Sequence, residues 1–145
     1  MSWVRIWIHL VFTTKNHTKV LNNQIRKSIF EHIIQNAKSK KIMLDCVNGY
    51  TDHIHCLLLL NKDQSISKSV GLIKGESSHW INENNLIKGK FAWQDDYWAV
   101  SVSESHVKAV RKYISNQEKH HREKTFSVEI DEFMKKYGWR YIKDE

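Results

Sequence analysis

The chain has 145 residues, the size of one ordinary domain, and 41% of them are hydrophobic, which is enough to bury a core. It contains no run of about 18 apolar residues, and this excludes a membrane-spanning helix. Lys and Arg outnumber Asp and Glu by 23 to 16, so the net charge of +7 favours a polyanionic partner, although a basic surface that only keeps the protein in solution is equally compatible. We expect a single domain over residues 1–145.

The N-terminal segment is apolar but alternates with Arg5 and His9 and is not followed by a small-residue cleavage site. It is therefore predicted to be a strand over Trp3–Thr13 and not a signal peptide. The two cysteines, Cys46 and Cys56, fall in strand-like runs without a CxxC pattern. This favours two buried thiols in a reducing cytoplasm, while a bridge between neighbouring strands stays open.

Apolar periodicity predicts the remaining elements in chain order. The further strands are expected over Ile42–Tyr50, His55–Leu60 and Trp98–Ser103. Helices are indicated by apolar stripes at a spacing of about 3.6 residues, which fall at Ile25, Ile29, Ile33 and Ala37, at Val70, Ile73, Ser77 and Trp80, at Val107, Val110, Ile114 and Gln117, and at Ile130, Phe133, Met134 and Tyr137. The expected N-caps are Asn22 or Asn23, Ser65 or Ser67, Ser103 or Ser105, and Ser127, with Gly138 closing the last helix.

This order of elements predicts an α+β fold, with a ferredoxin-like or RRM-like antiparallel sheet (βαββαβ) followed by additional C-terminal helices. The strand His55–Leu60 is apolar at both parities, so both of its faces should be covered. The first two helices can cover one face. The helix that starts near Val107 is the natural cover of the other face, and it carries Tyr113 and Gln117 towards one parity of the strand.

His53 and His55 are separated by one residue, and alternate residues of a strand point the same way, so their imidazoles should lie side by side. Two imidazoles can bind a divalent metal. However, nine histidines give roughly 0.5 chance H-x-H patterns in this chain, so two satisfied core histidines remain the alternative. Tyr113 and Gln117, four residues apart, share one helix face, where a half-buried tyrosine on an amphipathic helix is the alternative. His9 could neighbour the two histidines, or it could be structural.

Combined, these residues describe a coherent site. Two histidines and a glutamine carbonyl would supply three metal ligands and leave positions open for the oxygens of a phosphate. Tyr113, one helical turn from Gln117, could attack that phosphorus and form a phosphotyrosine link, which conserves the energy of the broken bond. The tyrosine hydroxyl has an ordinary pKa of about 10 and must lose its proton, but the sequence identifies no base.

These motifs resemble the single-tyrosine HUH transposases of small bacterial insertion sequences, including their repeat-associated relatives. The HUH pattern is HIH at His53–His55, and the most specific segment is VRKYISNQEKHHREKTF around Tyr113 and Gln117. Similar segments in the same order cover nearly the whole chain, namely IHLVFTTKNH, GYTDHIHCLLLL, SISKSVGLIKGESSHWINE and FAWQDDYWAVSVSES.

The resemblance implies a DNA transposase that cleaves single-stranded DNA and rejoins it through a 5′-phosphotyrosine intermediate. Tyr113 would be the nucleophile, and His53, His55 and Gln117 would bind Mg²⁺ or Mn²⁺. The implied partners are hairpin-containing element ends and a second copy of the chain, in a homodimer whose sites are shared between subunits. Two other functions stay open, which are a non-catalytic RRM-like module that binds single-stranded nucleic acid and a metal nuclease that uses activated water.

The loop before the fourth strand departs from the resemblance, because Asp96 and Trp98 stand where relatives often carry glycines. We expect DNA handling to differ there, and Trp93 or Trp98 could stack on bases. Candidate DNA-phosphate contacts, each as readily a solvated surface charge, are Lys15, Lys19, Lys74, Lys88, Lys90, Arg111, Lys112 and Arg122.

Overall fold

The computed structural model describes residues 1–119 and 125–137. One antiparallel sheet, with the strand order β2-β3-β1-β4, is formed by β1 (Trp7–Thr13), β2 (Met43–Gly49), β3 (His53–Leu59) and β4 (Trp98–Val102). The helices are α1 (Asn23–Ser39), α2 (Ile66–Glu83), α3 (Val107–Ser115) and α5 (Phe126–Tyr137). The predicted ferredoxin-like α+β fold with additional C-terminal helices is confirmed. Within the described ranges, none of the helices has the length and apolarity needed to cross a membrane.

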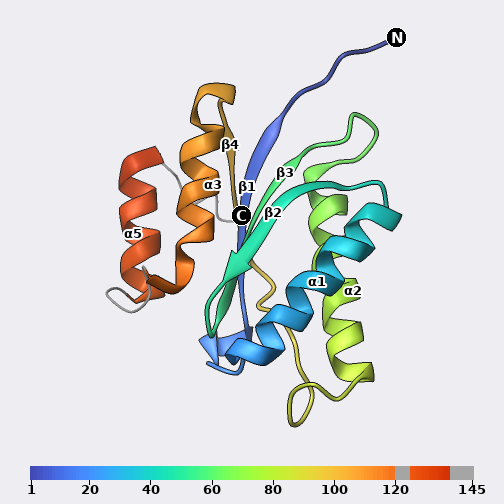
Figure 1. Cartoon of the computed structure of the whole chain (residues 1–145), viewed down its shortest axis with the longest axis vertical. Coiled ribbons are helices and arrows are strands. Elements are labelled where there is room, and N and C mark those ends of the chain that lie inside the picture. Colours follow the sequence, from blue (N-terminus) through green and yellow to red (C-terminus); the bar gives the residue numbers. More distant parts are fainter. Residues whose placement is uncertain (120–124, 138–145) are drawn as a thin grey trace, which may run out of the picture.

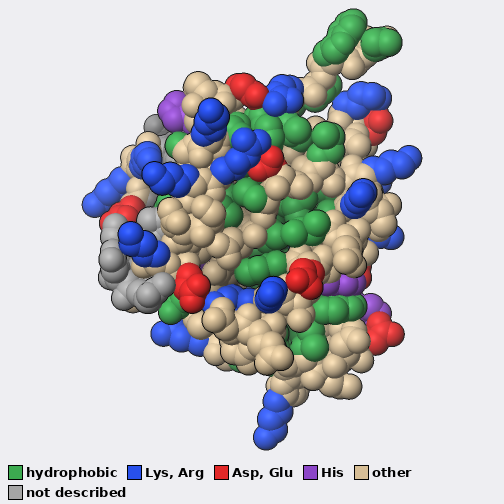
Figure 2. Space-filling view, viewed as in Figure 1, with side chains coloured by type: hydrophobic (Ala, Val, Ile, Leu, Met, Phe, Trp, Pro, Cys, Tyr) green, Lys and Arg blue, Asp and Glu red, His purple; other side chains and the backbone are tan. Residues whose placement is uncertain are grey.

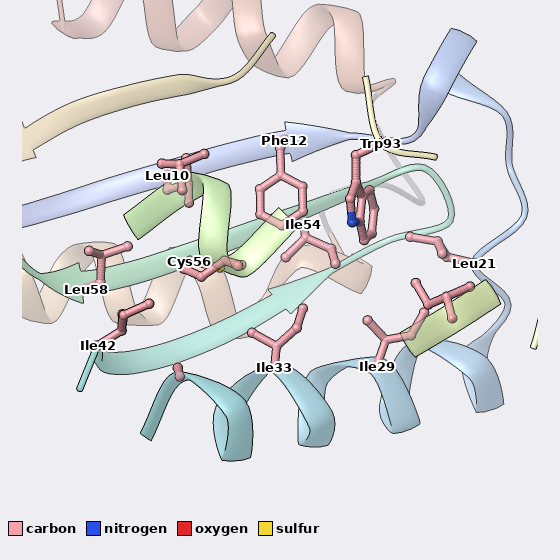
Figure 3. Close-up of a cluster of buried hydrophobic side chains, with 14 of the residues drawn as sticks. Leu10, Phe12, Leu21, Ile29, Ile33, Ile42, Ile54, Cys56, Leu58 and Trp93 are labelled. Atoms are coloured by element: carbon pink, nitrogen blue, oxygen red, sulfur yellow. The ribbon is translucent and has the colours of Figure 1, made fainter. Parts of the chain in front are cut away.

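The sheet separates two helical layers (Figure 1). Helices α1 and α2 cover one face, where alternate side chains of β1 and β3 pack against the apolar stripe of α1 (Figure 3). Leu10, Phe12 and Ile54 are fully buried there, as is Ile29 from α1. Burying each such side chain stabilises the fold by roughly 1.5–3 kcal/mol, so this face holds the main core.

The opposite face of the sheet is covered by α3, whose Val107, Val110 and Ile114 pack against Trp7 and Leu57 in a second, smaller cluster. Strand β3 is therefore buried on both faces, as its apolar sequence predicted. The apolar stripe of α3 is also confirmed, and its burial fixes which side of the helix faces the sheet.

Polar contacts also hold α3 against the β2 edge of its own sheet. The Arg111 guanidinium donates two hydrogen bonds to the Asp45 carboxylate, at 2.7 and 2.8 Å. The Asn48 side-chain amide donates to the backbone carbonyl of Ile114 at 2.9 Å. These contacts fix the position of the helix that carries the predicted nucleophile.

The predicted N-caps of α1 and α2 are confirmed. The Asn22 side chain accepts a hydrogen bond from the amide of Ile25, and the Ser65 side chain accepts one from the amide of Lys68, each at 3.0 Å. Strand β3 begins at His53, two residues earlier than expected, so both histidines of the HIH motif lie inside the strand.

The predicted caps of the last two helices are wrong. Before α3 a 3₁₀ turn over Glu104–His106 intervenes, so neither Ser103 nor Ser105 caps that helix. Ser127 lies inside α5, because the Thr125 hydroxyl already accepts a hydrogen bond from the amide of residue 128 at 3.3 Å. Gly138 lies outside the described residues.

The two thiols point to opposite faces of the sheet. Cys56 is buried in the main core, and the half-buried Cys46 packs on the α3 side. Both are free thiols, so the bridge that the sequence left open does not form. Burial raises the pKa of Cys46 to about 11, which makes it a poor nucleophile near neutral pH.

The hairpin between β2 and β3 requires a glycine. A Cβ atom at Gly49 would lie 2.2 Å from the backbone oxygen of His53, closer than side-chain carbons approach other atoms. The same oxygen accepts a hydrogen bond from the Tyr50 amide at 3.0 Å. Gly49 therefore sets the position of the first histidine of the motif.

Candidate active site

His53 and His55 lie side by side on the α3 face of β3, fully buried, with ring centroids 5.2 Å apart. Each imidazole is held through its Nδ1 atom. His53 Nδ1 lies 2.8 Å from an Asp52 carboxylate oxygen, and His55 Nδ1 lies 2.9 Å from Nε2 of His9 on β1. The parity argument is confirmed, and the two Nε2 atoms are left to face α3 and α5.

Helix α3 brings Tyr113 and Gln117 to these histidines. The Gln117 side-chain oxygen lies 3.1 Å from His53 Nε2, and the Tyr113 ring centroid lies 5.7 Å from that of His55. α3 ends at Ser115 and the chain is helical again from residue 117, yet both side chains stay on the sheet side. The four residues predicted for the site thus meet within one chain.

A fifth residue, Glu129 on α5, completes the cluster and was missed by the sequence prediction. Its carboxylate oxygens lie 3.1 Å from His55 Nε2 and 3.6 Å from His53 Nε2. The Tyr113 hydroxyl and the Gln117 amide both donate hydrogen bonds to its Oε1 atom. No sequence signal indicated it, because a glutamate beside an apolar helix stripe is ordinarily a solvated charge.

Burial shapes the charges in this cluster. It raises the pKa of Glu129 to about 8, and the nearby carboxylates of Asp52 and Glu132 add to the shift. Burial also lowers the pKa of His9 to about 4, so that imidazole is neutral at physiological pH. An opposite charge in direct contact would lower the pKa of Glu129 and favour the ionised carboxylate near neutral pH.

The side chains present fit a divalent cation. His53, His55 and Glu129 offer ligand atoms that all lie within 4.8 Å of one another, and Gln117 adds an amide oxygen 3.1 Å from His53 Nε2. Ligands about 2.1 Å from one shared ion lie at most about 4.2 Å apart, so the cluster is close to the size that a bound ion requires. Imidazole nitrogen combined with carboxylate and amide oxygen suits several divalent ions, so the cluster is a candidate metal site whose geometry does not choose the metal.

A cavity of about 160 Å³ lies against the Tyr113 side of this cluster, between α3 and α5. Its lining comprises His9, Ala109, Val110, Tyr113, Glu129, Glu132 and Lys136. The cavity leaves room for a small group beside the tyrosine and places an amine on its wall.

The predicted DNA contacts fall into different settings. Lys74 donates to the backbone oxygens of Gln94 and Asp95, at 2.6 and 2.9 Å, so its amine holds the loop before β4 instead of pointing outwards. Arg111 is engaged by Asp45, and Arg122 lies outside the described residues. The remaining candidates are all exposed, namely Lys15, Lys19, Lys88, Lys90 and Lys112. Lys and Arg side chains gather over α3 (Figure 2).

Trp93 and Trp98 have different environments. Trp93 is buried against Phe12 and donates a hydrogen bond from its indole to the Ser77 hydroxyl at 2.9 Å, so it belongs to the core. Trp98 is half-buried and pairs across the sheet with Val11, whose other strand partner is His55. Cross-strand partners share a face, so Trp98 lies on the same face of the sheet as His55, about 10 Å away.

Comparison with known proteins agrees with this arrangement. The model of the family described as "Transposase IS200 like" matches residues 2–117. The chain belongs to this IS200-like transposase family. The family match ends at Gln117, so α5 and Glu129 lie beyond it.

Individual relatives show the same similarity. The ISDra2 transposase TnpA of Deinococcus radiodurans is 24% identical over 114 residues, which cover 75% of this chain and 81% of the relative. A crystal structure of a candidate transposase from Deinococcus radiodurans R1 has a TM-score of 0.65 at 23% identity, covering 80% of this chain and 93% of that one. A REP-associated tyrosine transposase bound to a REP hairpin has a TM-score of 0.55 at 16% identity, covering 81% and 67%. These structures support the fold.

Proposed function

We propose that this transposase is a single-tyrosine HUH enzyme, which cuts single-stranded DNA through a metal-dependent attack by Tyr113 and rejoins the cut end elsewhere. The observation that carries the proposal is the meeting of Tyr113, Gln117 and Glu129 with the paired histidines His53 and His55 in one buried cluster. A module that only binds nucleic acid has no need of this cluster.

The metal ligands in this proposal are the Nε2 atoms of His53 and His55, the amide oxygen of Gln117 and the carboxylate of Glu129. When bound, Mg²⁺ or Mn²⁺ would act as a Lewis acid on a non-bridging oxygen of the scissile phosphate. Asp52 and His9 hold the two imidazoles through their Nδ1 atoms, so the ligand nitrogens keep their direction.

Tyr113 carries the covalent step. Its phenolic oxygen attacks phosphorus and forms a new O–P bond, while the bond from phosphorus to the 3′-oxygen breaks, and that oxygen takes a proton from water. The proton of Tyr113 has an acceptor already in contact, the Oε1 atom of Glu129. The product is a 5′-phosphotyrosine and a 3′-hydroxyl end, and attack by another 3′-hydroxyl reverses the step and joins the strands.

The surroundings of Tyr113 favour a nucleic-acid substrate, because a phosphate can reach the tyrosine from the cavity beside it. The cavity beside it has Lys136 on its wall, and a cation there would favour an approaching phosphodiester. Trp98 lies on the same face at a distance suited to stacking on a neighbouring unpaired base. We therefore propose single-stranded DNA with hairpins near the element ends, in line with the hairpin bound by the REP-associated transposase.

The packing of α3 on its own sheet, through Val110, Ile114 and the Arg111–Asp45 pair, supports a site that is assembled from one subunit. We propose that one chain, acting as a single domain in the cytoplasm, can cut DNA by itself. The homodimer with shared sites that the sequence suggested stays a prediction.

The test is strand cleavage with the metal varied. Single-stranded DNA from the flanks of the gene, labelled at its 5′ end, is incubated with the protein and Mn²⁺, Mg²⁺ or EDTA. We expect a shortened 5′-labelled product only with metal, lost in His53→Ala and kept in His32→Ala, a matched change of a histidine on the opposite face. Metal-independent binding without any cleavage would favour the RRM-like binder, and cleavage that leaves the 3′ fragment free of protein would favour the nuclease that uses water.

A further inference from the structure

The buried hydrogen bond between His9 and His55 joins two imidazoles from neighbouring strands. His9 Nε2 and His55 Nδ1 are 2.9 Å apart, and the two side chains are 1% and 0% exposed. His9 pairs with Leu57 across the sheet, which places it diagonally beside His55 on the same face. The contact is therefore fixed by the strand register and not by a mobile side chain.

A hydrogen bond between two neutral imidazoles can be arranged in two ways, and only one suits a metal ligand. If His55 donates its Nδ1–H to His9, the Nε2 atom of His55 bears the lone pair that a cation needs. If His9 donates instead, the proton of His55 sits on Nε2, where it points at Glu129 Oε1, 3.1 Å away. The second arrangement keeps His55 from coordinating a metal through Nε2.

His53 has no such choice. Its Nδ1 atom faces an Asp52 carboxylate oxygen at 2.8 Å, and an ionised carboxylate can only accept. The Asp52 carboxylate therefore holds the proton of a neutral His53 on Nδ1, which leaves the lone pair of Nε2 on the side of Gln117 and Glu129. The two ligands of one motif thus depend on different partners, a carboxylate for His53 and an imidazole for His55.

We propose that His9 is a positioning residue of the metal centre, which accepts the Nδ1–H of His55 and so presents the Nε2 lone pair of His55 to a divalent cation. This proposal rests on the metal site of the proposed function. His9 is not itself proposed as a metal ligand, and it acts on the metal only through His55. Removing such an outer partner typically weakens metal binding 10- to 100-fold.

The experiment measures Mn²⁺ affinity without DNA, by electron paramagnetic resonance of unbound Mn²⁺, in the full chain. His9→Leu cannot accept a hydrogen bond and should weaken Mn²⁺ binding about tenfold or more. His9→Gln keeps an oxygen near the position of Nε2 and should stay within about threefold of the unmodified protein. His32→Leu, which removes a histidine on the α1–α2 side that contacts Glu76, is the matched control and should leave the affinity unchanged.

Nitrogen-15 chemical shifts give a second readout that packing damage does not imitate. In the Mg²⁺-loaded protein, His55 should carry its proton on Nδ1, and in His9→Leu this preference should weaken. If His9→Leu fails to fold, His9→Gln is compared with His9→Asn, whose amide is one methylene shorter and should bind Mn²⁺ more weakly. Equal affinities across these folded variants, or a proton on Nε2 of Mg²⁺-loaded His55, would overturn the proposal. An unmodified protein that binds no Mn²⁺ would instead refute the metal site itself.

Discussion

Glu129 gives the most quantitative prediction, because its buried carboxyl group should make the metal-free protein less stable as the pH rises. Its pKa is about 8 in the folded chain and about 4.3 in an unfolded one. The folded state therefore binds this proton more tightly. That contribution to stability is complete below about pH 4.3 and is lost as the pH rises towards 8.

The size of the effect follows from the shift. Each unit of pKa difference corresponds to about 1.4 kcal/mol, so the loss approaches 1.4 kcal/mol per pH unit in this window and totals about 5 kcal/mol as an upper value. Glu129→Gln removes the titration, while its amide oxygen can still accept from Tyr113 and Gln117. We expect the variant to gain stability relative to the unmodified protein steadily between pH 5 and pH 8.

The assay is urea unfolding followed by circular dichroism, in EDTA, at half-unit steps from pH 5 to pH 8.5. Asp131→Asn is the matched control, since it removes an exposed carboxylate from the same helix. Its stability should differ from that of the unmodified protein by a small and nearly constant amount. Parallel pH curves for Glu129→Gln and the unmodified protein would refute the buried position of Glu129. Mn²⁺ should also restore stability to the unmodified protein at pH 8 more than to Glu129→Gln.

Three further predictions concern the hairpin, the DNA face and the assembly. Gly49→Ala should lower the free energy of unfolding by about 1–3 kcal/mol in urea titrations, because the new methyl group collides with the His53 carbonyl, and an unchanged value would contradict that close approach. Trp98→Ala should weaken binding of single-stranded DNA by about 1–3 kcal/mol in anisotropy titrations with EDTA, whereas Trp98→Phe should keep most of it, and equal affinities would remove the stacking role. Mixing Tyr113→Phe with His53→Ala should restore no cleavage if each chain uses its own tyrosine, and recovery in a mixed dimer would show that subunits share their sites.

Much of the arrangement of the candidate site could be predicted from the local pattern of apolar residues in the sequence. The alternation along β3 put both histidines on one face, and the stripe that runs through α3 and continues to Gln117 put that residue on the side that faces them. Those patterns are dictated by burial, which repeats with the period of the strand or helix. The order of strands and helices then predicted that the helix with Tyr113 covers the histidine face of the sheet, and it does.

The parts that could not be predicted depend on tertiary contacts. Glu129 is 74 residues beyond His55 along the chain, and the periodicity of the sequence does not indicate where α5 packs against the rest of the fold. Asp52 stands next to the HIH motif, but a residue just before a strand has no fixed direction until the hairpin at Gly49 is formed. The wrong cap at Ser127 has a similar origin, because Thr125, two residues earlier, offers the same hydroxyl and starts the helix sooner.

The proposed reaction requires that Tyr113 forms a covalent bond to DNA beside the cation that His53 and His55 would hold. The most direct measurement is mass spectrometry of the protein after incubation with Mn²⁺ and single-stranded DNA from the flanks of its gene, followed by digestion with trypsin and nuclease. We expect a phosphonucleotide on the peptide that contains Tyr113, absent in EDTA and absent in Tyr113→Phe. An adduct on another residue, or one that persists in Tyr113→Phe, would show that Tyr113 is not the nucleophile.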